Sequence, residues 1–121
     1  MAEDRTTLAL SADGFRILDE LEADGWFSTQ LAAYQAAIAL ALAKELPIPD
    51  RKELGKLETK FNVGSLDPRI REMVQRFYKG DVSRPYEVAQ LLAEAGLREM
   101  DQARKSDIRL SDALGIQASS G

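Results

Sequence analysis

The segment LAAYQAAIALALA, residues 31–43, contains a single strongly polar side chain, that of Gln35. Ala and Leu favour the helix, and neither Gly nor Pro interrupts the segment, so the sequence predicts a helix here. A surface helix of a small protein normally carries an apolar stripe and a charged face. This helix is apolar on every side. We therefore expect a second copy of the chain to bury it.

The preceding residues predict a strand followed by a helix and a turn. Residues 6–10 alternate between two faces, which is typical of a short strand. Ser11 is a suitable N-cap for a first helix that extends to about Ala23. The Asp24-Gly25 pair predicts a turn before the apolar helix. Residues 5–46 thus form a predicted strand–helix–turn–helix unit.

Both ends of the apolar helix carry recognisable signals. Ser28 or Thr29 would cap its N-terminus, because a hydroxyl can accept a hydrogen bond from a free backbone N–H. The helix extends to about Leu46, where Pro47 and Pro49 end it. At about 20 Å, the apolar block is too short to cross about 30 Å of hydrocarbon. We expect no membrane association.

The second half of the chain predicts a connector and a third helix. Residues 57–63 alternate apolar and polar side chains, which indicates a short strand or an extended arm. Asp67 and Pro68 are typical first residues of a helix. The apolar stripe of this helix, which predicts its core-facing side, consists of Ile70, Met73, Val74 and Phe77.

A fourth helix starts near Pro85, and Gly96 either ends or loosens it. Residues 107–115 add a last predicted turn. The expected architecture is one mainly α domain, residues 1–121, with a short N-terminal strand followed by four to five helices. Its expected parts are an oligomerisation unit (5–46), a basic connector (47–66), C-terminal helices (67–115) and a frayed tail (116–121).

The composition excludes several common kinds of active site and metal site. The chain of 121 residues contains no Cys and no His, so it lacks thiolate ligands, the commonest metal ligand and the commonest general base. We expect no enzymatic activity, no cofactor and no metal. The N-terminus has no basic region followed by an apolar run, which favours a cytoplasmic protein.

Charge is unevenly distributed along the chain. The net charge is −4, yet residues 51–80 carry eight basic and four acidic side chains, a local balance of +4. An anionic partner should therefore contact this segment or the N-terminal arm. Arg69, Arg71 and Arg76 lie off the apolar stripe of the third helix, where they form either a basic patch with the connector or an ordinary polar face.

The order of elements over residues 5–46 resembles a ribbon-helix-helix unit, in which two chains pair their N-terminal strands. The resemblance implies that the ribbon enters the major groove, with Arg5 and Thr7 facing DNA. It also implies that Ser28 and Thr29 offer backbone N–H groups to phosphate. An ordinary solvated strand edge accounts for the two outward strand residues equally well.

Residues 10–21 (LSADGFRILDEL), the apolar helix ending in PIPD at residue 50, and residues 55–67 (GKLETKFNVGSLD) are similar to the small E component of bacterial DNA phosphorothioation systems. That resemblance implies a small oligomer associated with DNA through basic side chains. The corresponding basic residues here are Arg51, Lys52, Lys56 and Lys60.

The expected subunit interface combines the inward strand positions, two bulky turn residues and the apolar helix. Its members are Leu8, Leu10, Trp26, Phe27, Leu31, Tyr34, Ala37, Ile38, Ala41 and Leu42. The sequence favours an oligomeric, non-enzymatic, DNA-associated accessory protein of a bacterial modification or defence system. Two alternatives remain: a protein-only adaptor for a larger enzyme, and a ribbon-helix-helix transcriptional regulator.

Overall fold

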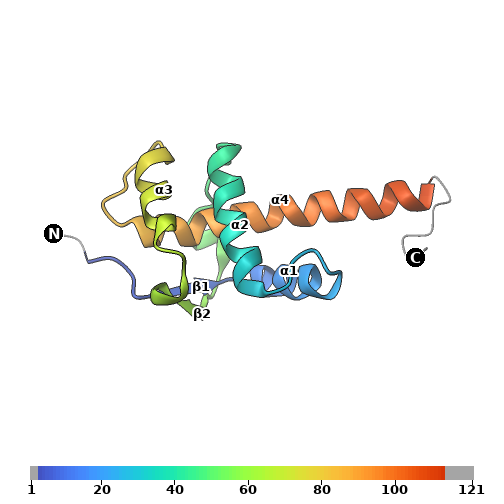
Figure 1. Cartoon of the computed structure of the whole chain (residues 1–121), viewed down its shortest axis with the longest axis horizontal. Helices are drawn as coiled ribbons and strands as arrows, with labels where there is room; N and C mark the ends of the chain where they lie inside the picture. The colour runs from blue at the N-terminus through green and yellow to red at the C-terminus, as the bar shows by residue number, and fades with distance from the viewer. Residues whose placement is uncertain (1–2, 114–121) are drawn as a thin grey trace.

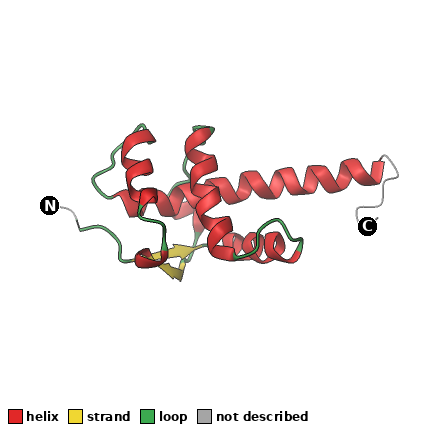
Figure 2. Ribbon diagram, viewed as in Figure 1, coloured by secondary structure: helices red, strands yellow, loops and turns green. Residues whose placement is uncertain are grey.

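The computed structural model describes residues 3–113, which form four α-helices and a two-stranded antiparallel sheet (Figures 1 and 2). Figure 1 shows α4 as a long rod against which the other elements pack, with its C-terminal end extending beyond them. The expected mainly α class with a short N-terminal strand is confirmed. In chain order the elements are β1 (Thr7–Leu10), α1 (Ala12–Ala23), α2 (Gln30–Ala43), the 3-10 turn η1 (Arg51–Leu54), β2 (Glu58–Asn62), the 3-10 turn η2 (Val63–Ser65), α3 (Arg69–Phe77) and α4 (Pro85–Ala113).

Helices α2 and α4 touch at their backbones. A Cβ atom placed on Gly96 would lie 2.0 Å from the carbonyl oxygen of Ala37, so only glycine fits at this point of α4. The apolar α2 is therefore buried on one side by α4 of the same chain, and not by a second copy as expected. Buried small residues repeat at intervals of three or four along both helices: Ala33, Ala37 and Ala41 on α2, and Ala89, Ala93 and Gly96 on α4.

Most of the expected subunit interface is the core of a single chain. Six of its members have exposed fractions of 0 %, which leaves them no surface for a partner: Leu8, Leu10, Tyr34, Ala37, Ile38 and Ala41. Their assignment to an interface is wrong, because α4 and the sheet already cover them. Leu42 is also buried, at 8 %. Of the remaining positions, Phe27 and Leu31 are half-buried and Trp26 is 43 % exposed.

Strand β1 is occupied along both edges. One edge pairs with β2, the strand anticipated from the alternation in residues 57–63, with Leu8 opposite Phe61. At the other edge, the backbone N–H of Ala9 donates to Gln90 Oε1 and that of Ser11 donates to Glu94 Oε1, both at 2.7 Å. A strand from another chain would have to displace one of these partners. The expected two-chain ribbon is therefore replaced by an intramolecular one.

The helix caps largely follow the sequence signals. Ser11 and Thr29 accept hydrogen bonds from the first turns of α1 and α2, and Gly25 ends α1 with a φ of 75°. Helix α4 differs from expectation, because it continues through Gly96 to Ala113. The glycine permits the contact with α2 and does not end the helix. The expected turn at residues 107–115 is the last part of α4 up to residue 113, and the tail at 116–121 lies outside the described residues.

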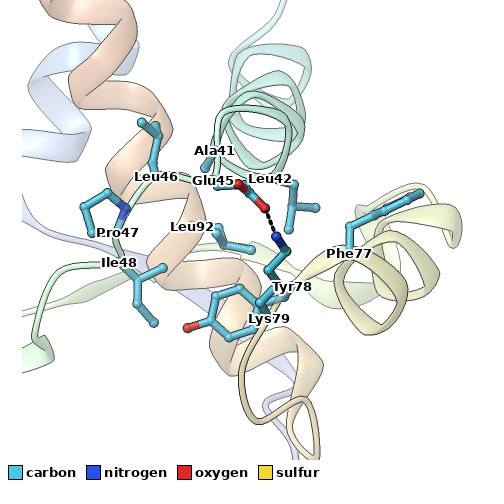
Figure 3. A pocket seen from close by; sticks show the side chains of 10 residues that line it. All are labelled: Ala41, Leu42, Glu45, Leu46, Pro47, Ile48, Phe77, Tyr78, Lys79 and Leu92. Carbon is cyan, nitrogen blue, oxygen red and sulfur yellow. Dashed lines mark ion pairs between the residues drawn. The ribbon is translucent and has the colours of Figure 1, made fainter.

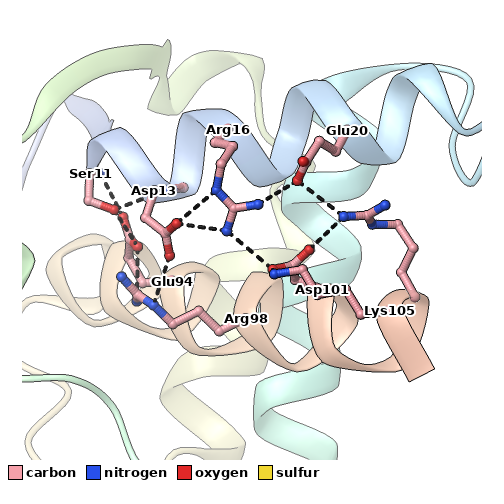
Figure 4. A network of polar contacts seen from close by, with 10 residues as sticks. Ser11, Asp13, Arg16, Glu20, Glu94, Arg98, Asp101 and Lys105 are labelled. Carbon is pink, nitrogen blue, oxygen red and sulfur yellow. Dashed lines mark hydrogen bonds and ion pairs between the residues drawn. The ribbon is translucent and has the colours of Figure 1, made fainter. Parts of the chain in front are cut away.

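Acidic side chains of α1 pair with basic side chains of α4 (Figure 4). Arg104 contacts Asp24 at 2.8 Å and Glu20 at 3.1 Å, and Arg98 contacts Asp13 at 3.6 Å. These contacts fix α1 along the second half of α4. Three acidic residues in or directly after α1, Asp13, Glu20 and Asp24, thus have basic partners on α4.

The buried carboxylate of Asp101 lies at the centre of this network. Burial opposes its ionisation, but hydrogen bonds from Lys105, Arg104 and Arg16 outweigh burial and lower its pKa. Because the folded pKa is lowered, this group stabilises the fold above its ordinary pKa of about 3.9. That stabilisation is lost as the pH falls through the folded value.

Replacement of Gly96 by alanine tests the helix contact. The added methyl group would overlap the Ala37 carbonyl, so we expect Gly96→Ala to lower the free energy of unfolding by at least about 3 kcal/mol. Urea denaturation followed by circular dichroism measures this change. Gln102→Ala, at an exposed position of the same helix, should change it by less than about 0.5 kcal/mol. A stabilised Gly96→Ala variant, as helix propensity alone predicts, would contradict the close contact.

Replacement of Asp101 by asparagine tests the ion network. Asp101→Asn should be less stable than the wild type at neutral pH, because Arg16, Arg104 and Lys105 lose their shared carboxylate. It should also lose less stability on acidification below about pH 4, since the titrating group is gone. Thermal melts over a pH series measure both effects, with Glu53→Gln as the exposed control. Parallel acid profiles for the variant and the wild type would argue against this role.

Candidate functional site

The N-terminal DNA-contact prediction does not match the position of Arg5. Its guanidinium donates to the Thr7 carbonyl at 2.9 Å and pairs with Glu87 of α4 at 3.2 Å. Thr7 itself is half-buried opposite Asn62 in the β1–β2 ladder. Arg5 thus stabilises the N-terminal arm against α4. Because this guanidinium is already paired and β1 is enclosed, the predicted base contacts by these residues are not available.

Ser28 and Thr29 are exposed at the start of α2, as a phosphate contact would require. Their surroundings are acidic, however. Gln30, the next residue, donates from Nε2 to Asp19 at 2.9 Å and to Glu22 at 3.0 Å. Two carboxylates beside the helix terminus oppose an incoming phosphate, so this part of the prediction is not supported by the local electrostatics.

Three of the predicted basic residues already have partners. Arg51 pairs with Glu87 at 3.0 Å, and the ammonium of Lys60 lies 5.5 Å from the centre of the Phe15 ring. Arg69 pairs with Asp67 at 2.6 Å. The hydrogen bond from Arg69 lowers the pKa of Asp67 to about 2. Four other cations are exposed and form no ion pair within the part of the chain that the structure describes: Lys52, Lys56, Arg71 and Arg76.

A groove of about 560 Å³ lies between the C-terminal ends of α2 and α3. We call it the α2–α3 groove. It is lined by Ala39, Leu42 and Ala43 of α2, by Met73, Arg76 and Phe77 of α3, and by Glu45, Tyr78 and Lys79 beyond the helix ends. Its volume is within the range of small-ligand and peptide-anchor pockets. Most of its lining is apolar, which favours an apolar occupant.

Phe77 is the most exposed large apolar side chain among residues 3–107, at 58 %. The sequence assigns it to the core-facing stripe of α3, but only Ile70 and Val74 of that stripe are buried, and Met73 is half-buried. The chain leaves the helix at Tyr78, and Phe77 projects from the last turn. In Figure 3, Phe77 and Tyr78 point to opposite sides of the chain.

A second, smaller hollow of about 290 Å³ adjoins the groove and is drawn in Figure 3. It lies between the turn after α2 and the segment after α3, with Leu46, Pro47 and Ile48 on one side. The two hollows share five residues in their walls: Leu42, Glu45, Phe77, Tyr78 and Lys79. The apolar walls of the two hollows therefore adjoin at the end of the α2–α3 layer, with the Glu45–Lys79 ion pair between them.

The rim of the groove carries both signs of charge. Glu45 of the α2 end forms an ion pair with Lys79, drawn as a dashed line in Figure 3. Glu45 has a φ of 51°, in the left-handed region that a non-glycine residue enters at a cost of about 1–2 kcal/mol. Arg76 lies on the α3 side and is exposed. The strained turn therefore holds an acidic side chain opposite a basic one.

Gln35, the single strongly polar residue of the apolar helix, holds the start of the segment that leads to α3. Its Oε1 accepts a hydrogen bond from the backbone N–H of Asp67 at 2.7 Å. This bond fixes α3 beside α2 at the end far from the groove. The groove walls are thus positioned by a contact made within the chain.

Among residues 3–107, no group of three or more metal-ligating side chains is found, and none of the helices that the structure describes is long and apolar enough to cross a membrane. No protein-family model, curated protein or solved structure matches this chain. The function therefore has to follow from the side chains that the fold brings together. The α2–α3 groove is the main surface of this kind.

Proposed function

We propose that this chain is a non-enzymatic protein-binding module that uses the α2–α3 groove to hold a partner, in the manner of an adaptor. The observation that carries the proposal is the 58 % exposure of Phe77 beside an apolar groove. Single exposed apolar residues are common, but a large aromatic side chain next to an apolar hollow is typical of an interaction site. Aromatic anchors in such hollows contribute much of the binding free energy.

The outer side of α2 extends the same surface. Ala32, Ala36 and Ala39 are half-exposed, and Ala43 is exposed. The helix contains no charged residue from Gln30 to Ala43, although α4 covers only one of its sides. A helix with a solvated face normally carries charge there. An apolar partner on this side would supply the missing cover.

Photo-cross-linking tests the proposal in the source cell. With p-benzoylphenylalanine in place of Phe77, irradiation should yield discrete covalent adducts with a protein, whose masses are measured by mass spectrometry. The same photoreactive residue in place of Glu53, which is exposed and outside the groove, is the matched control.

Adducts from position 77 that disappear when Ala43→Glu is added would support the groove as the contact. The introduced carboxylate would place a charge in an apolar contact. An equal adduct pattern from positions 53 and 77, or no protein adduct from position 77, would overturn the proposal. Ala43 is exposed, so Ala43→Glu should leave the fold intact.

A second candidate function is that of a DNA-associated accessory protein, as the sequence suggests. It is favoured by the exposed cations Lys52, Lys56 and Arg71, which make no ion pair with another described residue. Their charge remains available to phosphate groups. This candidate uses a different surface from the groove, and it can be tested separately.

Duplex binding measured by fluorescence anisotropy over a salt series tests this candidate. Wild-type binding should weaken steeply with salt, and the triple variant Lys52→Ser, Lys56→Ser, Arg71→Ser should reduce the salt slope by about 0.9 for each phosphate that is no longer neutralised. Arg69→Ser is the matched control, because Arg69 is paired with Asp67. Absence of wild-type binding at low salt would exclude DNA association.

A further inference from the structure

We infer that the partner in the α2–α3 groove is a second copy of this chain, in a two-fold symmetric dimer that places Phe77 of each copy in the groove of the other. The inference rests on the proposed function, because it names the occupant of the same groove. The dimer differs from the one expected from sequence, since it uses the outer side of α2 and the end of α3. The sheet and the α2–α4 contact remain inside each copy.

The first argument is that a protrusion and a matching hollow occur side by side on one surface. A two-fold interface uses the same patch on both subunits, so the patch must fit itself. Phe77 projects from the last turn of α3 and also borders the groove. Rotation about an axis beside this residue brings each ring over the apolar wall formed by Ala39, Ala43 and Met73 of the other copy.

The second argument is the charge at the rim. Arg76 on the α3 side is exposed, and within the described residues it has no ion-pair partner. Glu45 on the α2 side has a side chain that is 61 % exposed despite its contact with Lys79. A two-fold rotation exchanges the α2 side with the α3 side. It therefore brings Arg76 of one copy towards Glu45 of the other, twice in each dimer.

The arrangement of the helices agrees with such an axis. Figure 1 shows α2 and α3 next to each other with their C-terminal ends at the same level, and both helices line the groove. A two-fold axis parallel to these helices places α2 of one copy opposite α3 of the other. It also keeps the C-terminal ends of all four helices at the same height along the axis. An acidic or a basic helical peptide would match one side of the rim and oppose the other, whereas a second copy satisfies both.

Sedimentation equilibrium of the full chain at about 100 µM tests the dimer, which should be the main species. Phe77→Ser should weaken dimerisation about 30-fold or more, because an aromatic anchor is removed. Trp26→Ser, which removes another exposed aromatic residue outside the groove, is the control and should leave the dimer unchanged. Thermal melts check that each variant stays folded.

A charge exchange then tests the geometry. Arg76→Glu and Glu45→Lys should each weaken self-association at least about tenfold, because like charges face each other twice. An equimolar mixture of the two variants should form a heterodimer, since each introduced charge meets its opposite and the native pair also remains. This recovery cannot come from improved folding of either variant alone.

Each outcome bears on the inference. Recovery of dimerisation in the mixture supports the two-fold contact. Unchanged dimerisation of either single charge-reversal variant overturns it. A monomeric wild type at the same concentration also overturns it. In that case, cross-links from position 77 to a protein of another mass would still uphold the binding module. Failure of all cross-links would remove the proposed function as well.

Discussion

The contact between Ala37 and Gly96 determines how the rest of the chain can pack. Two helix backbones approach so closely there that no side chain fits between them. This approach lets α4 cover one whole side of α2 with small residues on both helices. Helix α4 also contacts β1, α1 and α3, so these elements are arranged around the same helix (Figure 2). This crossing accounts for the buried alanines of α2, namely Ala33, Ala37 and Ala41, but not for the alanines on its outer side.

Polar side chains of α4 hold the N-terminal elements, whereas its small residues pack against α2. Gln90 and Glu94 satisfy the free edge of β1, and Arg98 and Arg104 hold the acidic helix α1. Each of these α4 side chains extends from the face that meets the N-terminal segment. Helix α4 is therefore both the apolar support of α2 and the polar support of β1 and α1. A partner must use the surface left uncovered, which includes the end of the α2–α3 layer.

Local signals predicted the local structure well. Ser11 and Thr29 marked the helix starts, Gly25 marked a helix end, and the alternation in residues 57–63 indicated β2. Partners distant in the sequence were not predicted, because periodicity shows that a face is buried but not what buries it. The same limit applied to Gly96. A glycine is needed there because the backbone of Ala37, 59 positions earlier, lies against it. Phe77 was wrongly assigned to the core because the apolar stripe of α3 extends one turn past the core. The available signal was its position directly before Tyr78, Lys79 and Gly80, where the helix ends.

The hydrogen bonds from β1 and Ser11 to α4 have a consequence for the order in which the chain can fold. The N–H groups of Ala9 and Ser11 receive their partners from residues 90 and 94, which are more than 80 positions later. During synthesis at about 5–20 residues per second, the N-terminal strand must wait several seconds for them. Until α4 has left the ribosome, β1 and the apolar α2 have no stable place to pack. This protein is thus expected to fold late and as one unit, with its N-terminal segments exposed until then.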